Sequence, residues 1–218
     1  MNTKLLLIRH GETEWSKDDR FTGISDVGLN TVGRNQAFAL AHRLTFLSNS
    51  ISAVFSSPMK RSMETAQIIA DQLGLSVQVV SELKELNYGV WEGLKRKEIL
   101  TRFIKEYELW ANDPIACSPP EGETGQALVE RALPAIERLI AGQEEKTFIV
   151  VAHKTINRLI ICSLLGIPLK NYRYAIVQDT ACLNVLSFSP DKRTSLIKLN
   201  DTSHYSNQLF MEERERVE

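Results

Sequence analysis

Two histidines and two arginines stand at positions of this chain where polar side chains can gather around a ligand. Arg9 and His10 directly follow one short apolar run, and His153 follows another in the same way. Arg61 lies one turn into a helix predicted after a third apolar run. Arginine binds phosphate oxygens with two parallel hydrogen bonds, whereas histidine can act as a nucleophile or donate to a developing charge. Together, these four side chains could bind and attack a phosphate group.

Each of these residues also has an ordinary structural explanation. A single histidine after a buried strand is more often a hydrogen-bonded structural residue, and a single arginine at a helix start is usually solvated or ion-paired. His42 and His204 lie in helical or polar surroundings and are not candidates. No His-x-x-x-His or similar spacing supports a metal site, so we expect neither a metal nor another cofactor.

The four candidates can meet only if the strands that precede them are neighbours in one sheet. Short apolar runs predict strands, and they lie at 4–8, 51–55, 76–80, 147–152, 181–188 and 194–199. Apolar residues at helical spacing predict helices, and they lie at 31–47, 58–73, 94–110, 128–141 and 156–165. This alternation predicts a three-layer α/β/α sandwich with a mostly parallel central sheet. In such sheets ligands bind beyond the carboxyl ends of the strands, which is where the candidates stand.

Composition limits the compartment and the partners. The chain has 218 residues, of which 43% are hydrophobic and 24% charged, and this excludes membrane, fibrous and disordered classes. Its 26 basic and 27 acidic residues leave a net charge of −1, so we expect no nucleic-acid or membrane partner. Three cysteines without a C-x-x-C motif suit a reducing cytoplasm. No linker divides the chain, which predicts one domain over 1–218. The charged tail at 211–218 is expected to be frayed. The oligomeric state stays open, with a homodimer through a sheet edge or an exposed helix as one option.

A more specific pattern comes from ordered motifs around the candidates. The motifs are Arg9-His10-Gly11-Glu12-Thr13, Arg20-Phe21-Thr22-Gly23, and the segments 33–37, 56–66, 82–93, 120–124 and 150–153. In this order they resemble the motifs of the histidine phosphatase superfamily, the phosphoglycerate mutase-like enzymes. The resemblance is closest to the branch of bacterial α-ribazole, phosphoserine and broad-specificity phosphatases. It covers nearly the whole chain and implies the phosphoglycerate mutase-like fold.

The resemblance also implies catalytic roles for the four candidates. His10 would attack the phosphorus atom and form a phosphohistidine intermediate, and a neutral imidazole can do so without a metal. Arg9, Arg61 and His153 would hold the phosphoryl oxygens, where positive charge stabilises the transition state. The implied reaction is hydrolysis of a small phosphomonoester.

A carboxyl group would complete the reaction as general acid and base. By the resemblance, Glu85 would protonate the leaving alkoxide and then deprotonate the attacking water. It must carry a proton at first, which burial or the nearby phosphate would favour. Glu82, three residues earlier, is the alternative, but the step from Glu85 to Gly89 matches the family pattern.

Further positions match places that contact substrate in family members. Thr22 and Gly23 match such positions through main-chain groups. Tyr88 and Arg96 match substrate-side positions of the mutases. We expect the segment 94–125 to cap the substrate and help to select it.

Two residues depart from the family pattern. Ser16 stands where mutases usually have Asn, and Lys154 follows His153 where many members have Gly. Lys154 could add a positive charge near the phosphate or point into solvent. The stretch from Glu85 to His153 is also shorter than in glycolytic mutases and lacks the insertion and arginine pair that grip a second phosphate.

The shorter stretch favours a phosphatase, because a mutase must shield its phosphoenzyme from water, whereas a compact, open site favours hydrolysis. The leading hypothesis is therefore a metal-independent phosphomonoesterase of the cytoplasm. One alternative is a cofactor-dependent phosphoglycerate mutase, which needs a bisphosphoglycerate primer. The other is a catalytically weak protein that only binds a phosphorylated ligand.

Overall fold

Six strands form one central sheet in this computed structural model, which describes residues 2–47, 50–191 and 193–206. The strands are β1 (Thr3–Arg9), β2 (Ile51–Ser56), β3 (Val77–Val79), β4 (Thr147–Ala152), β5 (Leu183–Phe188) and β6 (Thr194–Asp201). Their order across the sheet is β3-β2-β4-β1-β5-β6. The first four run parallel, whereas β5 and β6 are antiparallel to their neighbours. The tail predicted at 211–218 lies outside the described residues.

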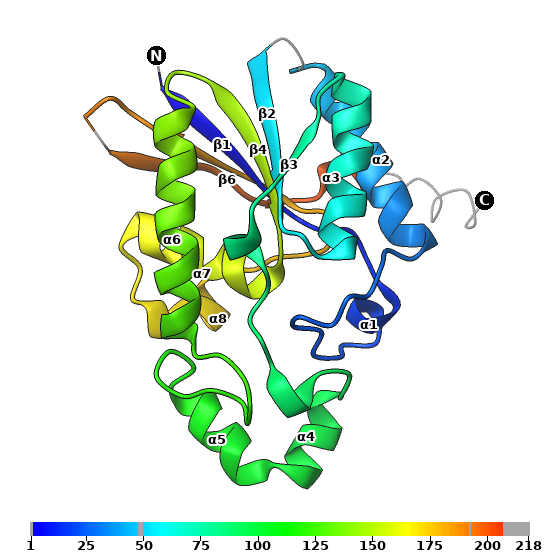
Figure 1. Cartoon of the computed structure of the whole chain (residues 1–218), viewed down its shortest axis with the longest axis vertical. Coiled ribbons are helices and arrows are strands. Elements are labelled where there is room, and N and C mark those ends of the chain that lie inside the picture. Colours follow the sequence, from blue (N-terminus) through cyan, green and yellow to red (C-terminus); the bar gives the residue numbers. More distant parts are fainter. Residues whose placement is uncertain (1, 48–49, 192, 207–218) are drawn as a thin grey trace, which may run out of the picture.

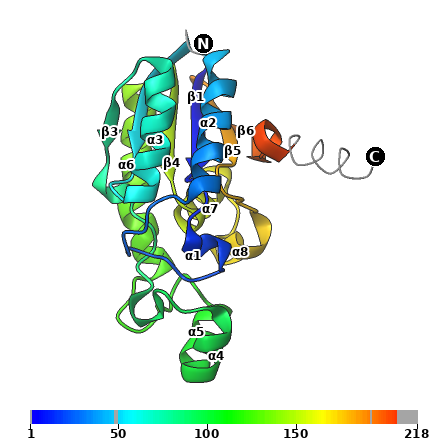
Figure 2. The same cartoon turned by 90° about the vertical axis from the view of Figure 1, so that its right-hand side faces the viewer.

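Helices cover both faces of this sheet (Figures 1 and 2). The helices are α1 (Glu14–Lys17), α2 (Thr31–Thr45), α3 (Lys60–Leu73), α4 (Arg96–Arg102), α5 (Ile104–Asn112), α6 (Gly125–Gly142), α7 (Lys154–Leu165) and α8 (Tyr172–Ala175). Short 3-10 turns lie at Ser81–Leu83, Gly89–Trp91 and Leu169–Asn171. Helices α2 and α3 pack together on one face, and α6 and α7 pack together on the other. The predicted α/β/α sandwich with a mostly parallel sheet is confirmed.

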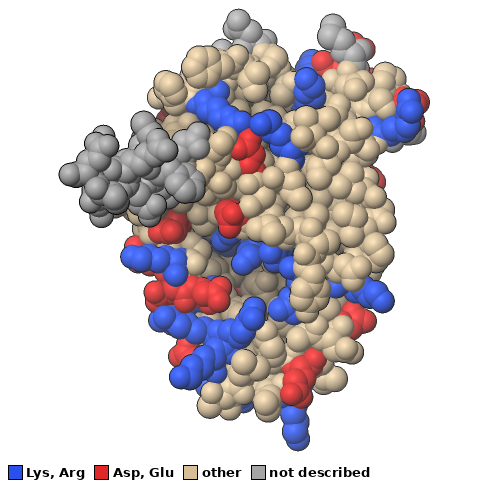
Figure 3. Space-filling model, turned by 180° about the vertical axis from the view of Figure 1, so that it is seen from behind, with Lys and Arg blue, Asp and Glu red and all other residues tan. Residues whose placement is uncertain are grey.

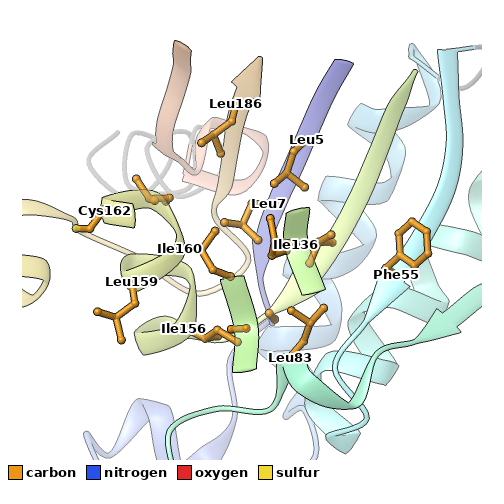
Figure 4. Packing of buried hydrophobic residues seen from close by; sticks show 14 of the residues in the cluster. Leu5, Leu7, Phe55, Leu83, Ile136, Ile156, Leu159, Ile160, Cys162 and Leu186 are labelled. Atoms are coloured by element: carbon orange, nitrogen blue, oxygen red, sulfur yellow. The ribbon is translucent and has the colours of Figure 1, made fainter. Parts of the chain in front are cut away.

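The alternation of side chains along β1 explains why the sheet is covered twice. Leu5 and Leu7 are buried in the apolar cluster with α6 and α7, whereas Leu6 and Ile8 are buried in the cluster with α2 and α3. Figure 4 shows Leu5 and Leu7 among side chains of α6 and α7 in the first cluster. Successive strand residues point to opposite faces, so a strand that is apolar throughout needs a helical layer on each side.

The helix predicted over 94–110 is in fact two helices. Phe103 leaves the helical backbone with φ −139° and ψ 41°, and the chain turns there from α4 into α5. The ring of Phe103 packs against a small apolar cluster that includes Trp91, Tyr107 and Trp110. The chain therefore forms two short helices that pack around this cluster, and not one long helix. The pair extends beyond the carboxyl end of the parallel strands (Figure 1).

Candidate active site

The topology brings the two predicted histidines side by side. Arg9, the last residue of β1, is in register with Ala152, the last residue of β4. His10 and His153 each follow directly, and their ring centroids are 5.2 Å apart at an interplanar angle of 62°. Arg61 arrives from the first turn of α3, which follows the neighbouring strand β2. Strand order thus gathers the four residues that the sequence singled out.

The tautomer of His10 is fixed by its own loop. Its Nδ1 lies 2.7 Å from the carbonyl oxygen of Gly11, which can only accept a hydrogen bond. Nδ1 therefore carries the proton, and the lone pair is on Nε2, where the Arg61 Nε donates a hydrogen bond at 3.2 Å. Burial, followed by the charges of Arg61 and Arg9, holds the pKa of His10 well below its usual value. His10 is therefore a neutral imidazole with Nε2 facing a cation.

The two arginines are buried cations without a partner carboxylate in the described residues. Arg61 is 1% exposed and donates to the carbonyl oxygens of Ser25 at 2.9 Å and Gly23 at 2.7 Å. Burial lowers its pKa to about 10, so the guanidinium stays charged at neutral pH. Arg9 donates to the carbonyl oxygen of Gln178 at 2.7 Å. The buried Nε of Arg9 has no hydrogen-bond partner among the described residues. Two buried guanidinium groups that form no ion pair with a described carboxylate make a site for an anion.

His153 packs behind His10 and is fully buried. Its Nε2 lies 2.8 Å from the hydroxyl of Ser57, whereas its Nδ1 has no partner within the described part of the chain. Burial, with the charge of Arg61 next in size, holds the pKa of His153 well below its usual value. A neutral ring whose Nδ1 is unpaired can carry its proton there. It can then donate a hydrogen bond from Nδ1 to an oxygen of a bound ligand.

Glu85 and Glu82 occupy different surroundings. The Glu85 carboxylate is buried and accepts backbone N–H bonds from Thr155 at 2.9 Å and Ile156 at 3.2 Å, at the start of α7. It lines the same pocket as His10. Glu82 instead pairs with Arg138 at 2.7 Å near the surface and does not line that pocket. Of the two carboxyl groups, Glu85 is therefore the one placed to exchange a proton with a ligand at His10.

Two residues outside the predicted set hold the Glu85 segment in place. Arg131 of α6 donates to the carbonyl oxygens of Lys84 at 2.9 Å and Glu85 at 3.1 Å. The carboxylate of Glu123 receives two further bonds from that guanidinium, at 2.7 Å and 2.8 Å. Glu123 lies within the motif at 120–124, which the sequence shows. The pairing of Glu123 with Arg131 could not be read from the sequence. The pair positions the general-acid candidate without touching the pocket.

A third residue, Glu92, holds the loop after Phe21. Its carboxylate accepts backbone N–H bonds from Ile24 and Ser25, both at 2.8 Å. Gly23 lies in this loop with φ +52°, and a Cβ there would lie 1.9 Å from an oxygen of Glu92. The positive φ favours glycine, and a side chain at this position would displace the Glu92 carboxylate that holds the loop. The Gly23 carbonyl faces Arg61.

The predicted substrate-side residues other than His153 line one pocket of about 140 Å³. Thr22, Gly23 and Tyr88 all contribute to it, and the Tyr88 hydroxyl lies 2.8 Å from that of Thr155. Arg96 and Trp110 reach it from the segment 94–125. Pockets for drug-sized ligands hold roughly 300–1,000 Å³, so this one suits a smaller molecule.

The two departures from the family pattern lie at the same pocket. Ser16 and Lys154 both line it. Lys154 is half-buried, so its ammonium group belongs to the pocket and not only to bulk solvent. Figure 3 shows Lys and Arg side chains gathered around a hollow on the face seen from behind.

Comparison with known proteins agrees with this geometry. A family model described as the histidine phosphatase superfamily (branch 1) matches residues 5–202. The chain belongs to this superfamily. The resemblance inferred from the motifs is thereby confirmed.

Among curated histidine phosphatase relatives, phosphoserine phosphatase 1 of Hydrogenobacter thermophilus is 29% identical over 92% of this chain and 93% of its own length. A bifunctional protein of Mycobacterium tuberculosis is 35% identical over 93% of this chain. The chain spans about half of that protein's length, 55%. A solved structure of a putative α-ribazole-5'-P phosphatase from Escherichia coli matches with a TM-score of 0.84 and 29% identity. It covers 93% of this chain and 98% of that one.

The buried histidines of this superfamily member predict a loss of stability in acid. Because both pKa values are lowered in the folded state, the unfolded chain binds more protons below about pH 6.5. We expect each histidine to cost about 1 kcal/mol of unfolding free energy between pH 6.5 and 5.5. Urea unfolding at a series of pH values tests this: His153→Gln should have a shallower pH dependence than wild type. The exposed His42 provides the control, and an unchanged slope in His153→Gln would contradict the account.

Proposed function

We propose that this chain is a metal-independent phosphoric monoester hydrolase that acts on small phosphorylated metabolites. The observation that carries the proposal is the pairing of a lone pair on His10 Nε2 with the Arg61 guanidinium, in a pocket that Glu85 also lines. This arrangement unites a nucleophile, an anion-binding cation and a proton donor. The small volume of the pocket and the phosphatase names of the relatives support a small substrate.

The first half-reaction forms a phosphohistidine. The phosphate oxygens bind Arg9, Arg61 and the free Nδ1 of His153, and the Arg61 Nε moves its bond from His10 to an oxygen. His10 Nε2 then attacks phosphorus, so an N–P bond forms as the ester P–O bond breaks. The proton of Glu85 passes to the leaving alkoxide. The arginines stabilise the charge on the equatorial oxygens of the transition state.

The second half-reaction restores the enzyme. A water molecule enters where the alcohol left and gives a proton to Glu85 as its oxygen attacks phosphorus. The N–P bond breaks, and the electron pair returns to Nε2 of His10. Inorganic phosphate leaves, and Glu85 is again protonated for the next cycle.

Further parts of the proposal concern the substrate side and the cellular setting. Thr22, Gly23 and Tyr88 contact the substrate, and the segment 94–125 acts as its cap, which the placement of Trp110 supports. The described cysteines are free, which supports a reducing cytoplasm as the compartment. No helix within the described residues is long and apolar enough to cross a membrane. Assembly as a homodimer stays a prediction.

Phosphate release from a panel of phosphomonoesters tests the proposal. The panel contains phosphoserine, α-ribazole phosphate, 3-phosphoglycerate and sugar phosphates, with EDTA present throughout. We expect release that survives EDTA and disappears in His10→Ala. Movement of the phosphate between positions of phosphoglycerate only after priming with a bisphosphate would identify a mutase instead. Binding of these compounds without turnover would identify a phospho-ligand binding protein.

A further inference from the structure

Three basic side chains form a second positive surface in the pocket, beside the one made by Arg9 and Arg61. Lys154 and Arg158 lie one turn apart on α7, and Arg173 comes from α8. All three line the pocket that His10 lines. We call these three residues the basic wall. None of them belongs to the set that the proposed hydrolysis uses.

The basic wall lacks internal partners. Within the described residues, no hydrogen bond or ion pair joins any of the three to another side chain or to the backbone, and the buried Nε of Arg158 and Nη1 of Arg173 have no acceptor. Arginines elsewhere in the chain do find carboxylates, as Arg34 does with Glu64 and Arg131 with Glu123. Buried donors without acceptors cost free energy, and so do like charges one helical turn apart. An anion bound against the wall would remove both costs.

The wall is also held in a fixed shape. The guanidinium of Arg173 lies 4.3 Å from the ring centroid of Trp110, which comes from the segment 94–125. A cation stacked in this way keeps the edge of its guanidinium free for hydrogen bonds. Arg158 and Lys154 are half-buried on a regular helix, so their stems have less freedom than those of fully exposed side chains. Preorganised donors bind an anion with less loss of entropy than flexible surface lysines do.

The charge of the pocket exceeds what one phosphate needs. Seven arginine and lysine side chains line it, against two acidic ones, Asp19 and Glu85. A phosphoryl group carries at most two negative charges, and Arg9 and Arg61 already match them. Among the remaining cations, Arg20 pairs with Asp18 at 3.4 Å. Lys154, Arg158 and Arg173 have no acidic partner within the described residues and are available for a second anion.

We propose that Lys154, Arg158 and Arg173 bind a second anionic group of the substrate, a carboxylate or a phosphate. The preferred substrates are then phosphomonoesters that carry another acidic group. This inference rests on the proposed function, because it takes the first phosphate to lie at His10.

Binding of matched ligands to the His10→Ala variant tests the inference without any need for turnover. In the first pair, 3-phosphoglycerate has a carboxylate where glycerol 3-phosphate has a hydroxymethyl group. The second pair is fructose 1,6-bisphosphate and fructose 6-phosphate, which differ in a second phosphate. We expect calorimetry to give at least about 10-fold tighter binding for the doubly anionic member of one pair, and that pair identifies the second group.

Substitutions in the same background assign the preference to the wall. Arg158→Gln should reduce the ratio of affinities to about 1–3, with little change for the singly anionic ligand. Arg102→Gln, which removes an exposed arginine outside the pocket, should keep the full ratio. If Arg158→Gln does not fold, Lys154→Gln takes its place, with exposed Lys97→Gln as its matched control.

Three results would overturn the inference. One is equal affinity within both pairs, and another is an Arg158→Gln variant that keeps the preference. The third is an Arg158→Gln variant that weakens both members of a pair equally, because Arg158 would then hold the first phosphate. Loss of the proposed function is a separate result, recorded as absence of phosphate release in the wild-type panel.

The preference should also depend on pH. Burial and then the charges of Arg9 and Arg158 lower the pKa of Lys154 to about 8, while Asp19 and Glu85 act in the opposite direction. Lys154 is charged below that pH and neutral above it, whereas the ligands are already ionised at pH 7. We expect the ratio of affinities to fall between pH 7 and 9 in the His10→Ala background. The fall should be absent when Lys154→Gln is added to His10→Ala. An equal fall in the single and the double variant would contradict a role for Lys154.

Discussion

Replacing His10 with glutamine is expected to lower kcat/KM for phosphate release by about 10⁴-fold or more. In the proposed mechanism the only covalent bond between protein and phosphorus forms at His10 Nε2, and removal of a nucleophile acts on the whole reaction. Glutamine keeps a polar side chain of moderate size in this buried position, so the fold should persist. Steady-state phosphate release with the best substrate of the panel measures the loss.

The matched control is His42→Gln, which removes an exposed histidine of α2. It should have the wild-type rate. Binding of phosphate-containing ligands should survive in His10→Gln, because Arg9 and Arg61 remain. A His10→Gln variant with more than a tenth of the wild-type rate would show that another group attacks phosphorus.

The second large effect is expected for Glu85→Gln, which should lower kcat by about 10²–10⁴-fold. A glutamine side chain can accept a backbone N–H bond, as Glu85 does from Thr155, but it cannot give up a proton. The loss should shrink sharply with p-nitrophenyl phosphate, since its leaving group departs without a proton. Comparison of kcat for this compound and for an alkyl phosphate isolates the acid step from any structural damage.

Glu82→Gln is the control for this experiment. Its carboxylate pairs with Arg138 away from the pocket, so both substrates should be hydrolysed at nearly the wild-type rate. An equal loss with both leaving groups in Glu85→Gln would contradict a role as general acid. A large loss in Glu82→Gln would move that role to the earlier carboxyl group.

The sequence predicted the sheet and the position of the pocket because local patterns carry this information. Strands that are apolar throughout require two helical layers, and the abrupt change to Arg9-His10 and to His153 marks the strand ends. The order of the motifs then identified the family. The pairing of β1 with β4 puts the histidines 5.2 Å apart and so meets the condition that their strands be neighbours.

Other features of the site were out of reach because they depend on tertiary contacts. Arg158 looks like one polar position of an amphipathic helix, and Arg173 lies in a short helix with no motif around it. Only the packing of α7 against α8 places both at the pocket. The contact between Arg131 and the Glu85 segment spans 46 residues and has no local signal. The turn at Phe103 likewise follows from packing of aromatic rings around Trp110, which helical spacing alone does not reveal.

The central claim is that phosphate passes through a covalent bond to His10. The most direct measurement mixes wild-type enzyme with its best substrate, quenches within one turnover in base, where phosphohistidine survives, and locates the phosphate by peptide mass spectrometry. We expect the phosphate on the peptide that contains His10, formed fast enough to account for release, and no such adduct in His10→Gln. Phosphate release at the full rate with no adduct on His10, or with the adduct on another residue, would contradict the account.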